Sequence, residues 1–143
     1  MALILLLASL SPFTESAYAD FVIHAGPASM GIGGSNPLSI PPTDPLDYEF
    51  VWLTDSEKEW SFGLSPGVFY GQRYTFADHF TYVSLGGGIV NEFNGLGPGI
   101  YTAFGYDYCD WFCFNIEYKQ ALGFTTKNIL SPYALRVGVT IEY

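Results

Sequence analysis

The sequence contains few basic residues, only two cysteines and no long hydrophobic run beyond its first residues. Its 143 residues include 5 Lys plus Arg against 14 Asp plus Glu, which gives a formal net charge of −9. A nucleic-acid-binding domain needs a basic surface, so this balance argues against a nucleic-acid partner. After the first ten residues, no apolar stretch reaches the roughly 18 residues that a membrane-spanning helix requires. The chain is instead rich in aromatic residues, at 18% of the total, which is unusual for a soluble domain.

The first 19 residues have the pattern of a secretory signal peptide. Residues 2–10 are an apolar segment too short to cross a bilayer, and Ala17-Tyr18-Ala19 is a small-x-small cleavage site. We therefore expect residues 1–19 to be a signal peptide and residues 20–143 to be the exported domain. No Lys or Arg follows Met1 before the apolar segment, so either this signal is unusual or translation starts further upstream.

The exported part of the chain alternates between apolar residues and small or polar residues. The clearest stretch is residues 133–143, where odd positions are apolar or aromatic and even positions are small or polar. This period of two is that of a β-strand with one apolar face, and a tilted strand needs about 9–11 residues to cross a bilayer. Further stretches alternate in the same way: residues 21–25, 48–52, 60–70, 100–108 and 112–122. Residues 80–90 are a seventh, more ambiguous stretch, because they are rich in glycine and both of their faces are fairly apolar.

The opposite faces of these stretches carry mainly Gly, Ala and Ser, with a few charges of both signs. Small residues suit the narrow interior of a small barrel, and aromatic residues at strand ends suit interfacial girdles. We therefore predict an all-β fold, a closed antiparallel transmembrane β-barrel of eight strands. Only seven stretches alternate, so the eighth strand is expected in residues 29–39 or in residues 69–78. The proline-rich segment 29–47 is otherwise expected to be an exposed loop.

The end of the chain carries a spaced pattern of residue types. A polar residue, a glycine, a hydrophobic residue and a terminal aromatic residue stand at Arg136, Gly138, Ile141 and Tyr143. This pattern resembles the C-terminal assembly signal of bacterial outer-membrane β-barrel proteins, with Tyr in place of the commoner Phe. The chain thus resembles small eight-stranded barrels of the OmpA/OmpX-like class. The resemblance implies a location in the bacterial outer membrane, with outer-membrane lipid, lipopolysaccharide and the barrel-assembly machinery as partners.

Several charged residues fall on the inward positions of the last three predicted strands: Asp107, Glu117, Lys119, Arg136 and Glu142. Charges inside a narrow barrel need partners, and neighbouring strands would bring the acidic residues close to the basic ones. One interpretation is an internal salt-bridge network that plugs the barrel. The other is a gated pore or a proton path. An eight-stranded barrel is only wide enough for its own side chains, which favours the plug.

The two cysteines, Cys109 and Cys113, flank a predicted tight turn. In an oxidising compartment they form either a disulfide or two free thiols, because pairing across a turn requires suitable geometry. No histidine stands near them in the sequence, so zinc is not expected there. His24 is expected to point into the barrel as a hydrogen-bonded side chain. The chain has no G-x-S-x-G or H-E-x-x-H motif, and we expect no catalytic residue, cofactor or metal.

Some small outer-membrane barrels remove acyl chains from lipid A, and that family carries a His-x-Ser pair on its penultimate strand. The matching stretch here, residues 117–122, contains neither His nor Ser, which argues against this activity. We therefore expect a non-enzymatic outer-membrane protein with a plugged interior and a role in envelope structure or surface contact. The alternatives are a narrow pore for small solutes, a lipid A-modifying enzyme and a secreted soluble β-sandwich.

Overall fold

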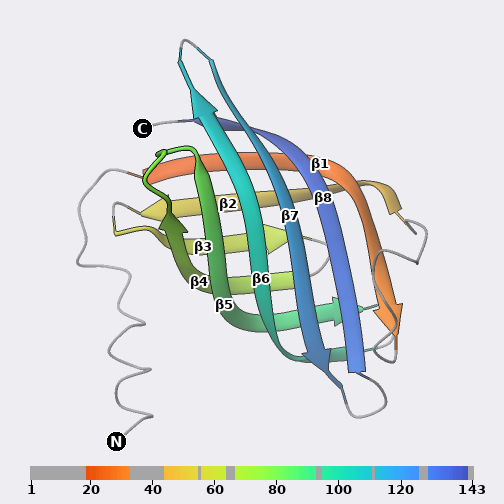
Figure 1. Cartoon of the computed structure of the whole chain (residues 1–143). Helices are drawn as coiled ribbons and strands as arrows, with labels where there is room; N and C mark the ends of the chain where they lie inside the picture. Colours follow the sequence, from red (N-terminus) through yellow and green to blue (C-terminus); the bar gives the residue numbers. More distant parts are fainter. Residues whose placement is uncertain are drawn as a thin grey trace, which may run out of the picture.

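The computed structural model of the chain contains a closed antiparallel β-barrel in which β8 pairs with β1 (Figure 1). The structure describes residues 19–32, 44–54, 56–63, 67–92, 95–110, 112–125 and 129–141. Its strands are β1 (Ala19–Ile32), β2 (Asp44–Thr54), β3 (Lys58–Gly63), β4 (Gly67–Thr75), β5 (Thr81–Glu92), β6 (Gly95–Cys109), β7 (Cys113–Phe124) and β8 (Ile129–Ile141). The predicted all-β fold and the closed barrel of eight strands are thus confirmed. Nearly all of the predicted signal peptide lies outside the described residues.

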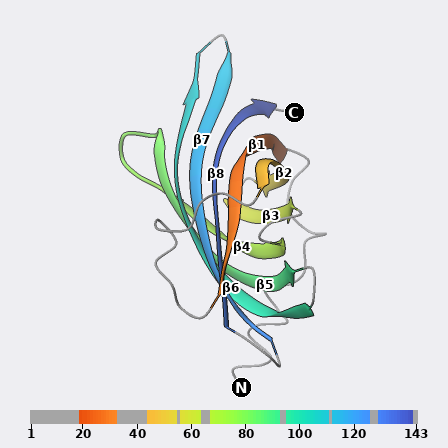
Figure 2. The ribbon, with the colours of Figure 1, turned by 90° about the vertical axis from the view of Figure 1, so that its right-hand side faces the viewer.

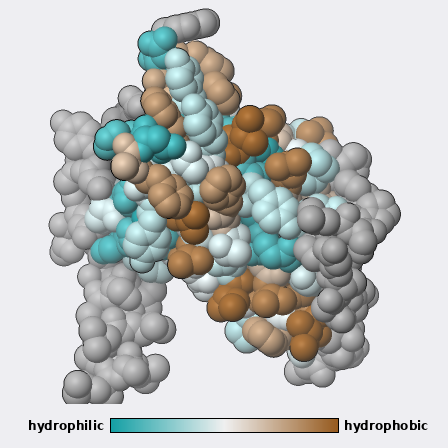
Figure 3. Space-filling view, in the orientation of Figure 1, coloured by the Kyte–Doolittle hydropathy of each residue, from teal (hydrophilic) through white to brown (hydrophobic). Residues whose placement is uncertain are grey.

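The alternation along each strand separates an outer face from an interior. In the register of β7 and β8, Ile116 lies opposite Val137 on the outer face, and Glu117 lies opposite Arg136 inside. Apolar side chains gather in several groups on the outer face seen in Figure 3. The most exposed apolar side chains are those of Leu96, Val137, Ile100, Phe104 and Tyr74. The barrel therefore presents apolar residues outward and encloses a group of charged residues.

The eighth strand is β4, and its position corrects the prediction of one strand over residues 60–70. β3 ends at Gly63 and β4 begins at Gly67, and Phe62 lies opposite Val68 in the hairpin between them. Because the connection, residues 64–66, has an odd number of residues, even-numbered residues of β3 pair with even-numbered residues of β4. The outward positions are therefore even-numbered in both strands, and the alternation continues unbroken through the turn. For this reason the period of two could not reveal the turn. Gly67 has a φ of 142°, a value that favours glycine over other residues.

The other candidate for the eighth strand, residues 29–39, belongs partly to β1. β1 extends to Ile32 and β2 begins at Asp44, so the segment 29–47 has strand structure at both ends where a loop was predicted. Residues 33–43 lie outside the described residues. The described residues also contain no helix that is long and apolar enough to cross a bilayer.

The two ends of the barrel differ in what they carry. We name the end where β1 begins and β8 ends the terminal end, and the opposite end the loop end. At the terminal end, the hairpin of β6 and β7 extends beyond the neighbouring connections (Figures 1 and 2). The connection between β4 and β5 lies at the same end, where Asp78 accepts hydrogen bonds from the backbone N–H groups of Phe80 (3.0 Å) and Thr81 (2.9 Å) and from the Thr81 hydroxyl (2.6 Å). These hydrogen bonds lower the pKa of the Asp78 carboxyl.

Candidate functional site in the barrel interior

The middle of the interior is occupied by a buried ion cluster around Glu49 of β2. The ammonium of Lys119 on β7 donates to both carboxylate oxygens of Glu49, at 2.9 and 3.0 Å, and to the Ser61 hydroxyl at 2.9 Å. Arg136 of β8 donates to Glu49 at 3.1 Å and also to Asp47. All these side chains are buried, so each charge depends on its partners rather than on water.

A second buried ion pair joins β3 and β4. The guanidinium of Arg73 donates to Glu59 through Nε at 3.1 Å and Nη2 at 3.0 Å. The hydroxyls of Ser84 and Tyr101 also donate to Glu59, each at 2.9 Å. The Arg73 guanidinium lies 3.8 Å from the centroid of the Tyr82 ring, a favourable cation–π contact. Glu59 of β3 is therefore satisfied by groups from three other strands, β4, β5 and β6.

A third group connects β1, β5 and β7 near the middle of the barrel. The Tyr82 hydroxyl donates to Glu117 at 2.7 Å, and Asn115 donates to the same hydroxyl at 3.0 Å. His24 Nε2 lies 2.7 Å from Asn115 Oδ1. Glycine makes room for these rings, since a Cβ at Gly105 would collide with Tyr82 and one at Gly138 would collide with His24. The expected inward, hydrogen-bonded position of His24 is what the structure has.

The structure brings three of the predicted interior charges together: Glu117, Lys119 and Arg136 are all buried inside the barrel. Lys119 Nζ lies 4.0 Å from Glu117 Oε1 on its own strand, and 2.9 Å from Glu49 across the interior. Arg136 is bound to acidic residues of β2, two strands away, which sequence reasoning did not anticipate. Glu142 lies outside the described residues.

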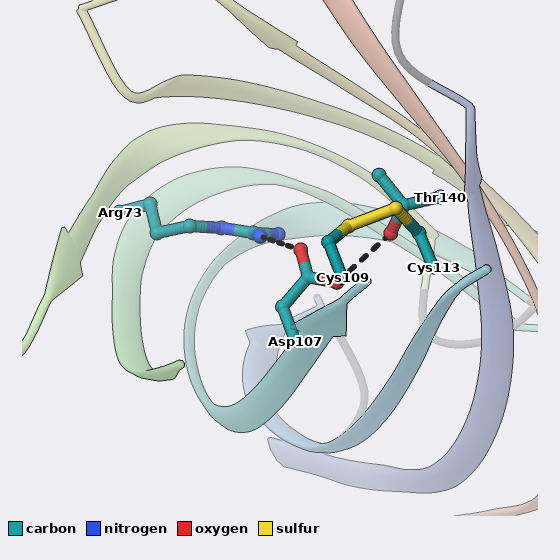
Figure 4. Close-up of a disulfide and its surroundings, with 5 residues drawn as sticks. All are labelled: Arg73, Asp107, Cys109, Cys113 and Thr140. Carbon is teal, nitrogen blue, oxygen red and sulfur yellow. Dashed lines mark hydrogen bonds and ion pairs between the residues drawn. A yellow bond between two sulfur atoms is a disulfide. The ribbon is translucent and has the colours of Figure 1, made fainter. Parts of the chain in front are cut away.

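Asp107 lies apart from that cluster, near the terminal end, and its side chain is 23% exposed. One carboxylate oxygen faces the Arg73 guanidinium at 3.8 Å, and the other accepts from the Thr140 hydroxyl at 3.0 Å (Figure 4). It thus links β6 to β4 and β8 at the edge of the interior.

Several residues of the interior were missed by sequence reasoning: Asp47, Glu49, Glu59 and Arg73. A usable signal existed for two of them, because Asp47 and Glu49 alternate with the aromatic residues of the stretch 48–52. Glu59 and Arg73 belong to the hairpin of β3 and β4, whose turn the alternation concealed. The network therefore draws on both halves of the chain.

A cavity of about 320 Å³ opens at the terminal end, beside the buried ions. Arg73, Tyr82 and Asp107 line it, together with residues of the β2–β3 and β4–β5 connections. Tyr82 therefore stands between this cavity and Glu117.

At the rim of the cavity, a disulfide joins Cys109 to Cys113 (Figure 4). Of the two states left open by the sequence, the structure has the bonded one. The bond connects the last residue of β6 to the first residue of β7, which also lie opposite each other in the strand register. It therefore closes the hairpin that extends beyond the neighbouring connections at the terminal end.

Toward the loop end, the interior holds a cluster of apolar residues. This cluster consists of Phe69, Val90, Tyr101, Ala103, Ala121 and Leu130. The rings of Phe69 and Tyr101 lie 5.0 Å apart between centroids. Glycines beside this cluster permit close approach, since a Cβ at Gly123 would collide with Val90. Ion-rich and apolar layers are therefore stacked along one barrel.

The residues of the predicted assembly signal have different positions on β8. Arg136 is buried inside, Gly138 lies against His24, and Ile141 is exposed on the outer face. Tyr143 lies outside the described residues. No protein-family model matches the chain, and no curated protein matches it.

Proposed function

We propose that the chain is an integral β-barrel protein of the bacterial outer membrane, with a plugged interior and a non-enzymatic role in envelope structure or surface contact. The observation that carries this proposal is the outer face, which combines many large exposed apolar side chains with few charges. Soluble monomers rarely expose contiguous apolar patches larger than a few hundred Å². Lipid is the environment in which such a face is stable.

The interior supports the same proposal, because it contains charged side chains where a soluble protein would have apolar ones. Arg136, Lys119 and Glu117 are among the most buried large side chains of the described residues. A soluble sandwich would place these residues in water and its apolar residues in the core. The reversed distribution is the one typical of transmembrane barrels.

The plug is favoured over a pore by the filling of the barrel. The ion pairs occupy the middle of the interior, and an apolar cluster that includes Phe69 and Leu130 fills part of it toward the loop end. An eight-stranded barrel is just wide enough for its own side chains to fill. The partners proposed for such a protein are outer-membrane lipid, lipopolysaccharide and the machinery that assembles outer-membrane barrels.

Gel mobility and cell fractionation test the location. The protein, folded in detergent, should migrate differently before and after boiling, and should fractionate with the outer membrane. A soluble protein that needs no detergent and shows no such shift would contradict the proposal.

A charge on the outer face gives a sharper test. Val137 is 61% exposed near the middle of β8. Val137→Arg should therefore cost almost nothing in a soluble protein, but about 2–4 kcal/mol at the midplane of a bilayer. The matched control is Ser56→Arg in the exposed β2–β3 connection, where little change is expected in either environment. Equal, negligible effects of the two variants on unfolding in lipid vesicles would count against the membrane proposal.

A further inference from the structure

Three atoms of kinds that can ligate a metal ion, each from a different strand, face one another in the middle of the barrel. His24 Nδ1 on β1 lies 3.6 Å from Glu49 Oε1 on β2 and 3.9 Å from Glu117 Oε1 on β7. All three residues are buried. This grouping is independent of whether the barrel lies in a membrane.

The hydrogen bond on the other side of the imidazole sets which atom of His24 faces the two carboxylates. Nε2 lies 2.7 Å from Asn115 Oδ1, and a carbonyl oxygen only accepts, so Nε2 carries a hydrogen. The Asn115 amide is oriented by its own donation to the Tyr82 hydroxyl. The neutral ring therefore presents the lone pair of Nδ1 to the carboxylates. A histidine that ligates a metal is typically held in this way, by donation from its second nitrogen.

Two of the three facing atoms have no hydrogen-bond partner among the described residues. These are His24 Nδ1 and Glu117 Oε1, which are both buried. Of the three converging acceptors only Glu49 Oε1 has a donor, the Lys119 ammonium at 2.9 Å, and two buried acceptors that face each other without a donor are unfavourable in a dry interior. A cation between the three atoms would remove this conflict.

The distances suit a bound ion better than direct hydrogen bonds. Separations of 3.6 and 3.9 Å are too long for a good N–H···O bond. Two ligands that are each about 2.1 Å from one ion, at an angle of about 110–135°, lie about 3.4–3.9 Å from each other. The two distances from His24 Nδ1 to the carboxylate oxygens fall in that range, and all three atoms lie within 4.8 Å of one another.

The charge of the interior also leaves room for a cation. The buried carboxylates are those of Asp47, Glu49, Glu59 and Glu117, and the buried cations are Arg73, Lys119 and Arg136. Among these described residues, one carboxylate is therefore in excess. Asp47 and Glu117 each have one buried oxygen without a hydrogen-bond partner among the described residues, and that of Glu117 is the one that faces His24.

We propose that His24, Glu49 and Glu117 bind one divalent first-row transition-metal ion, which ties β1 and β2 to β7. One imidazole nitrogen and two carboxylate oxygens form a donor set that such ions accept. Lys119 approaches Glu49 Oε1, and it keeps partners when the ion binds, because it also contacts Glu49 Oε2 at 3.0 Å and Ser61 at 2.9 Å. Tyr82, which hydrogen-bonds Glu117, lines the cavity at the terminal end, so that one side chain separates this cavity from Glu117.

Calorimetric titration of the metal-free, untagged, refolded barrel with Zn²⁺ tests the proposal. The expected result is one ion per chain, with binding weakened at least tenfold in His24→Leu and in Glu117→Gln. Glu59→Gln is the matched control, because Glu59 is equally buried but binds Arg73, and its Zn²⁺ affinity should stay within twofold of the unmodified protein. Heat-dependent gel mobility identifies which variants are folded.

X-ray absorption at the zinc edge supplies a second measurement that does not depend on variants. One nitrogen ligand and oxygen ligands at about 2.0–2.2 Å would support the site. No stoichiometric binding by the folded protein would overturn the proposal, and so would binding that Glu117→Gln and His24→Leu leave unchanged. If no metal binds, the positive charge between the three atoms would come from a proton on His24 Nδ1.

Discussion

One region of the interior is built around buried ions, whereas another, toward the loop end, is built from apolar side chains and glycine. In the ionic region, Glu49, Lys119 and Arg136 depend on specific partners, and losing one partner leaves a buried charge. In the apolar region, Phe69 and Leu130 pack through contacts that require no particular orientation. The comparison teaches that one barrel can combine a polar layer that specifies geometry with an apolar layer that excludes water.

Removal of one partner from the ion cluster should have the largest effect. Lys119→Met deletes the ammonium that binds Glu49 and leaves the cluster with more unpaired negative charge. We expect a loss of about 3–5 kcal/mol, measured by urea unfolding of the refolded barrel in lipid vesicles. The double variant Lys119→Met/Glu49→Gln should recover part of this loss. A loss that is simply additive would show that the two residues are not coupled.

In the apolar region, truncating a side chain should lower the free energy of unfolding by a smaller amount, because it leaves no unpaired charge in the interior. Leu130→Ala removes a buried side chain next to Phe69 and should destabilise the barrel by about 2–3 kcal/mol in the same unfolding measurement. Leu135→Ala is the control on the same strand, because Leu135 is exposed on the outer face. If both variants lose the same stability, the apolar cluster does not act as a packed core.

The disulfide lies outside both the ionic and the apolar region. Its contribution to the free energy of unfolding should be intermediate. Cys109→Ser/Cys113→Ser opens a short loop, for which the chain-entropy account gives about 2 kcal/mol. A reducing agent should lower the unfolding midpoint of the unmodified protein and leave that of the double variant unchanged. A midpoint that does not respond to reduction would argue that the hairpin is held by its strand pairing alone.

The smallest effect is expected at Asp78, in a connection outside the barrel wall. Because its hydrogen bonds lower the pKa of the carboxyl, its stabilisation is present above the unfolded-state pKa and is lost as the pH falls through the folded-state value. Asp78→Asn should therefore unfold slightly more easily at neutral pH, and the difference should shrink below about pH 3.9. Asp110→Asn makes the same charge change in the β6–β7 connection and serves as the control. A difference that persists at low pH would contradict this explanation.

The fold could be predicted because alternation is a local property of the chain. Residues 133–143 and 112–122 showed which side chains share a face, and β8 and β7 follow that pattern. The turn between β3 and β4 could not be found in this way. Its connection has an odd number of residues, so the same alternation of apolar and polar positions runs through both strands. A signal from turn chemistry at Gly63 and Gly67 was available but weak beside the alternation.

The ion cluster was predicted only in part, for a reason that concerns distance along the chain. Glu117 and Lys119 could be placed inside from the parity of their own strand. Their partner Glu49 lies on β2, and Lys119 and Glu49 are separated by 70 positions in the sequence. No local pattern encodes such a contact, so the partner of each charge could not be named.

The chain's own residue order is sufficient to specify strands with one apolar face and one small or polar face, because side chains alternate strictly along a β-strand. It also places most of the charges within those strands on inward positions. Which acid meets which base, and that His24 faces two carboxylates, depends on barrel closure. Closure sets the register of strands distant in sequence and brings their inward side chains to one height, so these contacts belong to the tertiary structure alone.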